Sequence, residues 1–258
     1  MEELITAAFL RFWLAVLGAV AGSFLDCAVS RWAEGDPHPF AGRSRCASCG
    51  HTLGAGDLVP VASYLFRRGR CRYCGEAIPA RCLWSELAGA AAFVWVGARF
   101  GLCLELGQWL VLAALLLALS LTDTAKRIIP DRLPLALAAN RAVWFFVLGH
   151  GAPELLAAGK ALAVPAALLA LVLALEKLLD REVMGGGDIK LLFVLALYLT
   201  WAELLLALLA GCLLGLLWAA LARRGKGGAL PFGPFLAAGT ILTVCCGGPV
   251  LDWYFGLF

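Results

Sequence analysis

Eight long apolar stretches constrain this sequence more than any other feature. A helix that crosses a bilayer needs about 20 apolar residues, and 62% of the 258 residues are hydrophobic, against roughly 45–50% in soluble domains. We therefore expect an all-α polytopic membrane protein with about eight transmembrane helices. The stretches are residues 4–29, 83–100, 106–122, 133–149, 155–179, 189–201, 202–222 and 231–255.

Two of these stretches leave alternatives open. Residues 189–201 are few for a span, and only the polar group 200–203 separates them from 202–222, so a seven-span arrangement also fits. The first stretch stands where a signal peptide would stand, but it lacks a basic start and Arg11 interrupts it. We expect it to remain as a membrane helix.

Lysine and arginine residues cluster on alternate connections. Of the 21 basic residues, seventeen lie in four segments, and the exceptions are Arg11, Arg99, Arg141 and Lys160. The positive-inside rule then predicts that these segments are cytoplasmic and that both termini are outside. Merging the sixth and seventh stretches would break this alternation, which favours eight spans. The net charge of +3 marks topology, so we expect contact with lipid and not with nucleic acid. The basic segments are 30–82, 123–132, 177–190 and 223–226.

One long polar insertion, residues 31–82, interrupts the predicted bundle. It carries four of the eleven prolines and five of the ten cysteines, four of them in paired spacing. The other connections are short, as is normal between packed helices. The chain therefore divides into a first transmembrane helix at 1–30, the insertion at 31–82 and a membrane bundle at 83–258.

Four cysteines in the insertion have the spacing of a metal site. They form two C-x-x-C pairs separated by 21 residues, and a glycine follows each pair: Cys46, Cys49, Cys71 and Cys74. Two such turns predict a tetrahedral, structural zinc site of the zinc-ribbon type, in which no open position remains for catalysis. Disulfides are disfavoured in the reducing cytoplasm, and a redox dithiol motif lacks its β-α-β surroundings. His51 stays open as a substitute ligand.

Two aspartates stand at the predicted cytoplasmic edge of the membrane. Asp123 ends the apolar run 110–122, and Asp188 opens the stretch 189–201 after three glycines, Gly185, Gly186 and Gly187. Ionisable groups in such places are costly and mark functional sites. Carboxylates at one depth on two helices suit an aspartyl dyad that shares a proton. Two unrelated acids that reach toward water remain the alternative. Helix capping is the expected role of Asp131, and Asp26 is a candidate for substrate contact.

Several motifs in this order resemble the type IV prepilin peptidases, polytopic aspartic proteases of bacterial pilus, type II secretion and competence systems. The similar segments are Gly22–Leu25 with Arg31, the cysteine loop 43–75, Asp123 through Asp131, Gly185–Leu191 with its G-x-G-D pattern, and Pro231–Leu236. The chain departs from many relatives at Asp26 and at Leu58, where asparagine is frequent.

The resemblance implies a function and a set of site residues. It implies an inner-membrane endopeptidase, with catalytic residues Asp123 and Asp188, that cleaves prepilin or pseudopilin leaders after glycine on the cytoplasmic side. The three glycines before Asp188 would then lie beside the substrate backbone. Relatives with the cysteine loop also methylate the new N-terminus with S-adenosylmethionine, so the resemblance makes the cytoplasmic insertion 31–82 the expected methyltransferase region. No residue of this sequence is assigned to that donor.

Two alternatives come from other classes of protein. A non-catalytic membrane scaffold of a pilus or secretion assembly would use the zinc loop for docking. A proton-coupled transporter would also need intramembrane acids, but transporters place them near the midplane. Incubation of the protein with a prepilin separates an enzyme, which shortens it, from a scaffold, which only binds it.

Overall fold

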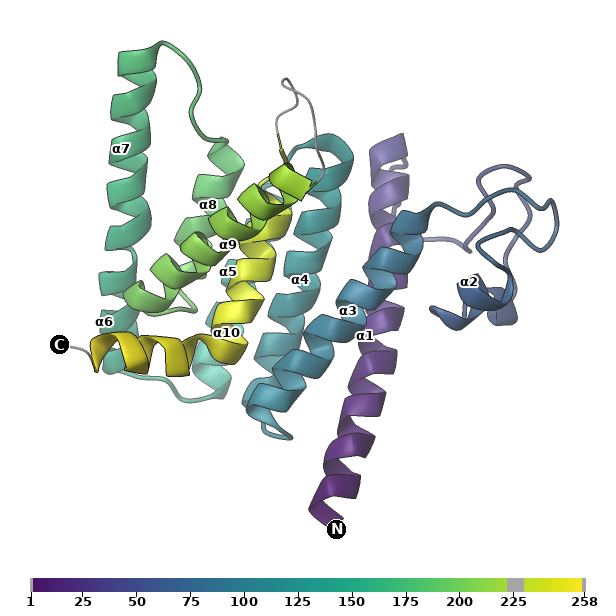
Figure 1. Ribbon diagram of the computed structural model, residues 1–258, viewed down its shortest axis with the longest axis horizontal. Helices are drawn as coiled ribbons and strands as arrows, with labels where there is room; N and C mark the ends of the chain where they lie inside the picture. The colour runs from purple at the N-terminus through teal and green to yellow at the C-terminus, as the bar shows by residue number, and fades with distance from the viewer. Residues whose placement is uncertain (1, 222–229, 257–258) are drawn as a thin grey trace. The chain divides into compact units, whose positions relative to one another are not determined.

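The computed structural model describes residues 2–221 and 230–256 (Figure 1). Within these residues all regular elements are helices, so the expected all-α class is confirmed. The insertion also contains two isolated β-bridges. The helices are α1 (Glu2–Glu34), α2 (Ala62–Phe66), α3 (Ala80–Phe100), α4 (Glu105–Lys126), α5 (Arg132–Val147), α6 (Ala152–Ala161), α7 (Ala163–Leu179), α8 (Gly186–Leu195), α9 (Trp201–Leu221) and α10 (Gly233–Phe255), with a single 3₁₀ turn at Ala55–Asp57.

Each of the eight expected stretches contains helix, but the helices differ in their capacity to span a bilayer. Among the described residues, five are long and apolar enough, which confirms a multi-pass membrane protein. Helix α5 has 16 residues and α8 has 10, and α3 is less apolar. The five are Ile5–Glu34, Glu105–Lys126, Ala152–Leu179, Trp201–Leu221 and Gly233–Phe255. The basic turn expected at 223–226 lies outside the described residues.

By its internal contacts the chain forms two compact units, Met1–Leu106 and Gly107–Phe258. In the first unit α3 packs along α1, with glycines at the crossing (Figure 1). A side chain at Gly18 or Gly22 would collide with the backbone carbonyl of Gly89 or Ser85, respectively. Small residues four apart allow such close approach of membrane helices. The Gly18-x-x-x-Gly22 spacing therefore fixes where α3 meets α1.

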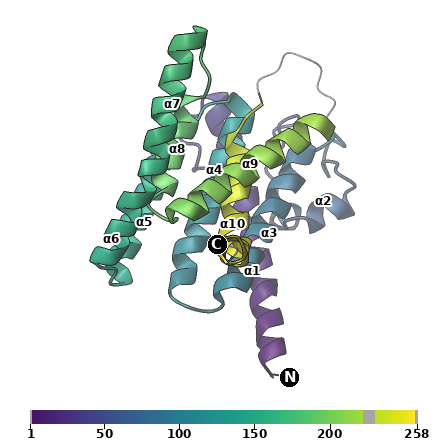
Figure 2. The same ribbon diagram turned by 60° about the vertical axis from the view of Figure 1, so that its left-hand side comes forward.

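The second unit is built around a core of leucine side chains from α4, α8, α9 and α10. Leu116, Leu191, Leu204 and Leu236, one from each helix, are at most 1% exposed. Helices α6 and α7 follow one another almost as one rod beside this core (Figure 2). Helix α10 bends toward its C-terminal end, as expected from Pro249, which cannot donate a helical hydrogen bond. The core holds the short α8, and with it Asp188, in place.

The predicted polar break between α8 and α9 is real, so the two helices are separate. Glu203 accepts hydrogen bonds from the backbone N–H and the hydroxyl of Thr200, both at 2.8 Å. The backbone N–H of Glu203 donates in return to the Thr200 hydroxyl at 3.4 Å. Such reciprocal bonding satisfies the free amides at the start of a helix. Arg141 in α5, an exception to the basic pattern, donates from Nε to the Leu197 carbonyl at 2.8 Å. It therefore satisfies a backbone group left free after α8 ends.

Candidate active site and four-cysteine cluster

Asp123 lies in the last turn of α4 and is 7% exposed. Its Oδ2 accepts a hydrogen bond of 2.9 Å from the backbone N–H of Gly233, at the first turn of α10. The free amides at the start of a helix carry partial positive charge. Burial disfavours the ionised carboxylate, and the hydrogen bond from this amide offsets part of that cost.

Asp188 lies in the first turn of α8 and is partly buried. Burial, together with the smaller effect of the negative charge of Asp123, raises the pKa of Asp188 to about 6. The two aspartates are 65 residues apart in the chain, yet Asp123 lies close enough for its charge to act on Asp188. An acid with a raised pKa beside a second carboxylate is the arrangement that a shared-proton dyad needs.

The glycines before Asp188 allow its helix to begin close to the segment after α4. A Cβ atom at Gly187 would come within 3.0 Å of the Ile129 side chain, whereas one at Gly186 would meet nothing within 4 Å. Packing against Ile129 therefore constrains Gly187, whereas Gly185 and Gly186 are exposed beside Asp188. That the three glycines lie beside a substrate stays a prediction.

Asp131 does not have the capping bond expected from the sequence. It occupies the N-cap position of α5, but its side chain caps no backbone N–H. Its Oδ1 instead accepts a hydrogen bond of 2.6 Å from Nζ of Lys190 in α8. The backbone of Asp131 is already helical, with φ of −57° and ψ of −21°, whereas a capping residue usually has an extended backbone. The exposed ion pair ties α8 to the start of α5.

The four cysteines of the insertion come together through two matching turns. Gly50 and Gly75 have φ of 70° and 72°, a left-handed conformation that glycine adopts without strain. In each turn the glycine N–H donates to the carbonyl of the first cysteine, Cys46 at 2.9 Å or Cys71 at 3.0 Å. A single β-bridge closes each turn, Arg45 with Thr52 and Arg70 with Ala77. The two turns point all four sulfurs at one place.

The sulfur cluster fits a zinc ion. The four Sγ atoms lie within 4.8 Å of one another, and those of Cys46 and Cys74 are 3.8 Å apart. With a Zn–S bond of about 2.3 Å, the edge of a tetrahedron is about 3.8 Å. The backbone N–H groups of Cys49 and Ser48 lower the pKa of Cys46 to about 6. Bound zinc would hold the two turns together and, with four protein ligands, would leave no site for water.

The remaining candidate ligand is engaged elsewhere. The ring of His51 stacks on Tyr73 with centroids 3.6 Å apart. The metal-competent group found among the described residues consists of cysteines alone. His51 therefore packs against the second turn and supports the cluster by contact.

The fold and the site together define a class of protein. It is a helical multi-pass membrane protein with a carboxylate pair and a four-cysteine cluster. Residues 16–100 match the family described as Bacterial Peptidase A24 N-terminal domain, and residues 110–220 match the Type IV leader peptidase family. The chain belongs to the type IV leader peptidase family.

Curated relatives extend the similarity over most of the chain. A protein of Bacillus subtilis (strain 168) is 34% identical over 222 residues, which cover 83% of this chain and 86% of the relative. A protein of Burkholderia pseudomallei (strain 1026b) is 37% identical and covers 91% and 84%, and one of Aeromonas salmonicida (strain A449) is 36% identical and covers 82% and 74%. Each bears the name prepilin leader peptidase/N-methyltransferase. No solved structure matches the chain.

Gly233 is the site residue whose role the sequence did not reveal. A Cβ atom there would lie 2.7 Å from Oδ2 of Asp123. The signal was present, because Pro231-Phe232-Gly233-Pro234 resembles the last-helix motif of the family. The sequence pattern did not show that Asp123 is the partner of Gly233. Asp123 precedes Gly233 by 110 residues, and only the folded chain brings the start of α10 to the end of α4.

Proposed function

We propose that this protein is an aspartic endopeptidase that removes the leader of type IV prepilins or pseudopilins, with Asp123 and Asp188 as its catalytic residues. The observation that carries the proposal is the approach of two carboxylates from separate helices, one held by a helix N-terminus. The names of the relatives supply the substrate class.

The two environments suggest different roles in the reaction. Asp123, bonded to the Gly233 amide, would take a proton from water as general base. Asp188, the more readily protonated of the two, would donate a hydrogen bond to the glycyl carbonyl and later a proton to the leaving amine. The exposed Gly185 and Gly186 leave room for an extended substrate backbone beside Asp188.

The decisive measurement is cleavage of a purified prepilin by purified protein in detergent. Asp123→Asn and Asp188→Asn should each abolish cleavage while zinc content and thermal stability stay unchanged, because asparagine keeps the shape and loses the proton transfer. An Asp252→Asn variant, changed at an exposed site on α10, serves as the control. Substantial cleavage by Asp188→Asn would reject the dyad, and binding without cleavage by the unaltered protein would favour the scaffold.

We further propose that the protein crosses the inner membrane eight times, with its carboxylate pair and insertion in the cytoplasm. The basic segments support this orientation, and each of the eight expected ranges contains helix. A phosphatase reporter that works only outside the cytoplasm, fused after Phe258, should be active. An inactive reporter there, together with an active one inserted in 31–82, would reverse the orientation.

A second activity is proposed on the names of the relatives, all of which include N-methyltransferase. The protein would methylate the newly exposed N-terminal amine with S-adenosylmethionine, and the zinc-bound insertion would shape part of that site. Mass spectrometry of a prepilin incubated with and without this donor reports cleavage and methylation together.

A further inference from the structure

The unit Met1–Leu106 contains a cavity of about 660 Å³ that the peptidase proposal leaves unused. Helix α1, the insertion and the start of α3 line it, and it is partly open to solvent. Small-molecule sites usually have volumes of about 300–1,000 Å³, apolar walls and a few placed polar groups. Here Leu53, Tyr64 and Ile78 supply apolar and aromatic wall, and arginine and carboxylate groups supply the polar part. The cavity is therefore of the right size and composition for a nucleoside-sized ligand.

Two buried acids line the part of this cavity formed by the helices. Asp26 of α1 is 7% exposed and Glu86 of α3 is 8% exposed. The glycine crossing explains why they meet there. Asp26 stands one turn beyond Gly22, and Glu86 stands one turn before Gly89, so close packing of the glycines brings the two acids to the same end of the crossing.

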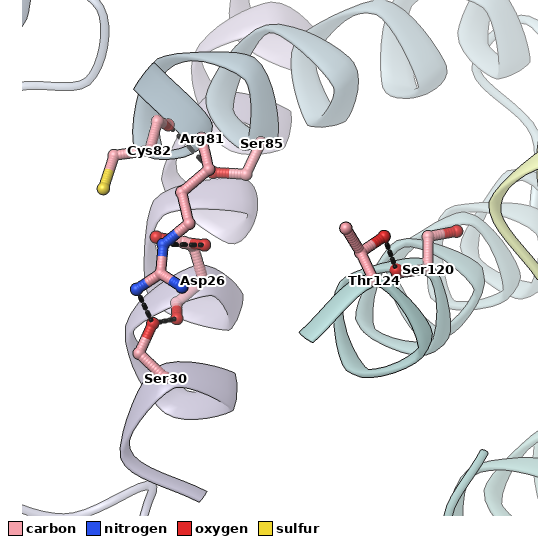
Figure 3. A network of polar contacts seen from close by, with 7 residues as sticks. All are labelled: Asp26, Ser30, Arg81, Cys82, Ser85, Ser120 and Thr124. Carbon is pink, nitrogen blue, oxygen red and sulfur yellow. Dashed lines mark hydrogen bonds and ion pairs between the residues drawn. The ribbon is translucent and has the colours of Figure 1, made fainter. Parts of the chain in front are cut away.

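Asp26 already has a counter-charge. Its Oδ1 lies 3.8 Å from Nε of Arg81, and Nη2 of Arg81 donates to the Ser30 hydroxyl at 2.8 Å (Figure 3). The guanidinium thus compensates this carboxylate. Arg81 is 55% exposed at its side chain and keeps further donors available.

Glu86 differs from Asp26 in this respect. Its Oε2 accepts a hydrogen bond of 2.6 Å from the backbone N–H of Val61 in the insertion, and no cation within 4.0 Å pairs with it among the described residues. A buried carboxylate without a cation is costly. Its natural complement is a positively charged ligand group that enters the cavity.

We propose that this cavity binds S-adenosylmethionine and that Glu86 faces its sulfonium and the substrate amine. The inference rests on the proposed methyltransferase activity and assigns it a site. The donor carries an adenosine, a carboxylate and cationic groups, and the cavity offers an aromatic wall, arginines such as Arg43 and Arg81, and the uncompensated Glu86. The cavity also lies within the N-terminal family match at 16–100, apart from Asp123 and Asp188 in sequence.

The reaction balances with this single carboxylate as base. Glu86 accepts a proton from the N-terminal ammonium, which leaves a neutral amine. The lone pair of the amine forms the N–C bond to the methyl group as the S–C bond breaks, and the electron pair of that bond stays on sulfur. The products are a methylammonium and the neutral thioether S-adenosylhomocysteine, and the proton on Glu86 returns to solvent.

The charge role of Glu86 is tested by binding of two ligands that differ in that charge. Titration calorimetry on the full chain in detergent would measure the Kd of S-adenosylmethionine and of S-adenosylhomocysteine for the unaltered protein, Glu86→Gln and the surface control Asp252→Asn. Glu86→Gln should weaken binding of the sulfonium ligand about tenfold or more and that of the thioether by much less, because an ionic hydrogen bond contributes about 1.5–3 kcal/mol. Asp252→Asn should change neither.

Prepilin cleavage and methylation by the same samples separate the possible failures. Glu86→Gln should cleave normally, which shows that it is folded, and should methylate poorly. If the unaltered protein binds and methylates but Glu86→Gln does the same, or weakens both ligands equally, the assignment of Glu86 is overturned. If the unaltered protein cleaves but neither binds nor uses the donor, the methyltransferase proposal itself fails.

Discussion

At the scale of single residues, the Gly233 amide decides the environment of Asp123. A methyl group at this position would be 2.7 Å from Oδ2 and would force the carboxylate or the start of α10 to move. The 2.9 Å hydrogen bond would lengthen as a result. The dyad therefore depends on a residue with no side chain of its own.

We expect Gly233→Ala to lower kcat/KM for prepilin cleavage by about 10- to 100-fold, since loss of a hydrogen bond to a charged group costs about 1.5–3 kcal/mol. Steady-state kinetics in detergent measure the effect. Gly248→Ala is the matched control on the same helix, because a Cβ atom there would meet nothing within 4 Å. Equal activity of the two variants would mean that the Gly233 contact does not govern Asp123.

The same residues show how far a sequence can predict this site. Asp123 and Asp188 are visible because each stands where an apolar run meets a charged turn. Gly233 and Glu86 are not, because a glycine and a glutamate acquire their roles only from partners 110 and 25 residues away. At Asp131 the sequence predicted a role that the structure does not have. Its side chain forms an ion pair with Lys190 and does not cap the helix.

At the scale of elements, the crossing of α1 and α3 depends on contact between backbones. Side chains at Gly18, Gly22 and Gly89 would each collide with the opposite helix. The length of the apolar stretches predicted both helices, but it could not predict that they pair. That information lies in three glycines whose partners are unknown until the helices are placed.

Gly89→Val should therefore destabilise the unit Met1–Leu106 by about 1–3 kcal/mol, the usual cost of overpacking. The midpoint of thermal unfolding in detergent should fall by several degrees, and zinc should be lost at lower temperature. The control is Ala91→Val, an exposed position two residues along α3. If both variants unfold alike, the crossing is looser than the packing of the glycines indicates.

At the scale of the whole molecule, the sequence divides chemistry between two units. The carboxylate pair belongs entirely to Gly107–Phe258, and the cysteines and the cavity belong to Met1–Leu106. Composition predicted a membrane protein because apolar length is a local property. It could not predict that α8 has only 10 residues, because tertiary packing and the Thr200–Glu203 contact determine where that helix ends.

Removal of zinc should then separate the two proposed activities. A site with four thiolate ligands has no position for a reacting water, so bound zinc would stabilise the insertion that lines the cavity and would take no part in hydrolysis. We expect Cys49→Ser, or treatment of the unaltered protein with a chelator, to reduce bound zinc, measured by atomic emission, and to weaken donor binding and methylation strongly. Cleavage of the prepilin should be largely retained, because Asp123 and Asp188 are held by α4, α8 and α10.

The control is Cys212→Ser, which changes an exposed cysteine on α9 and should leave bound zinc and both activities unchanged. Loss of cleavage in parallel with zinc, at a temperature where the chain stays folded, would show that the insertion contributes to hydrolysis as well.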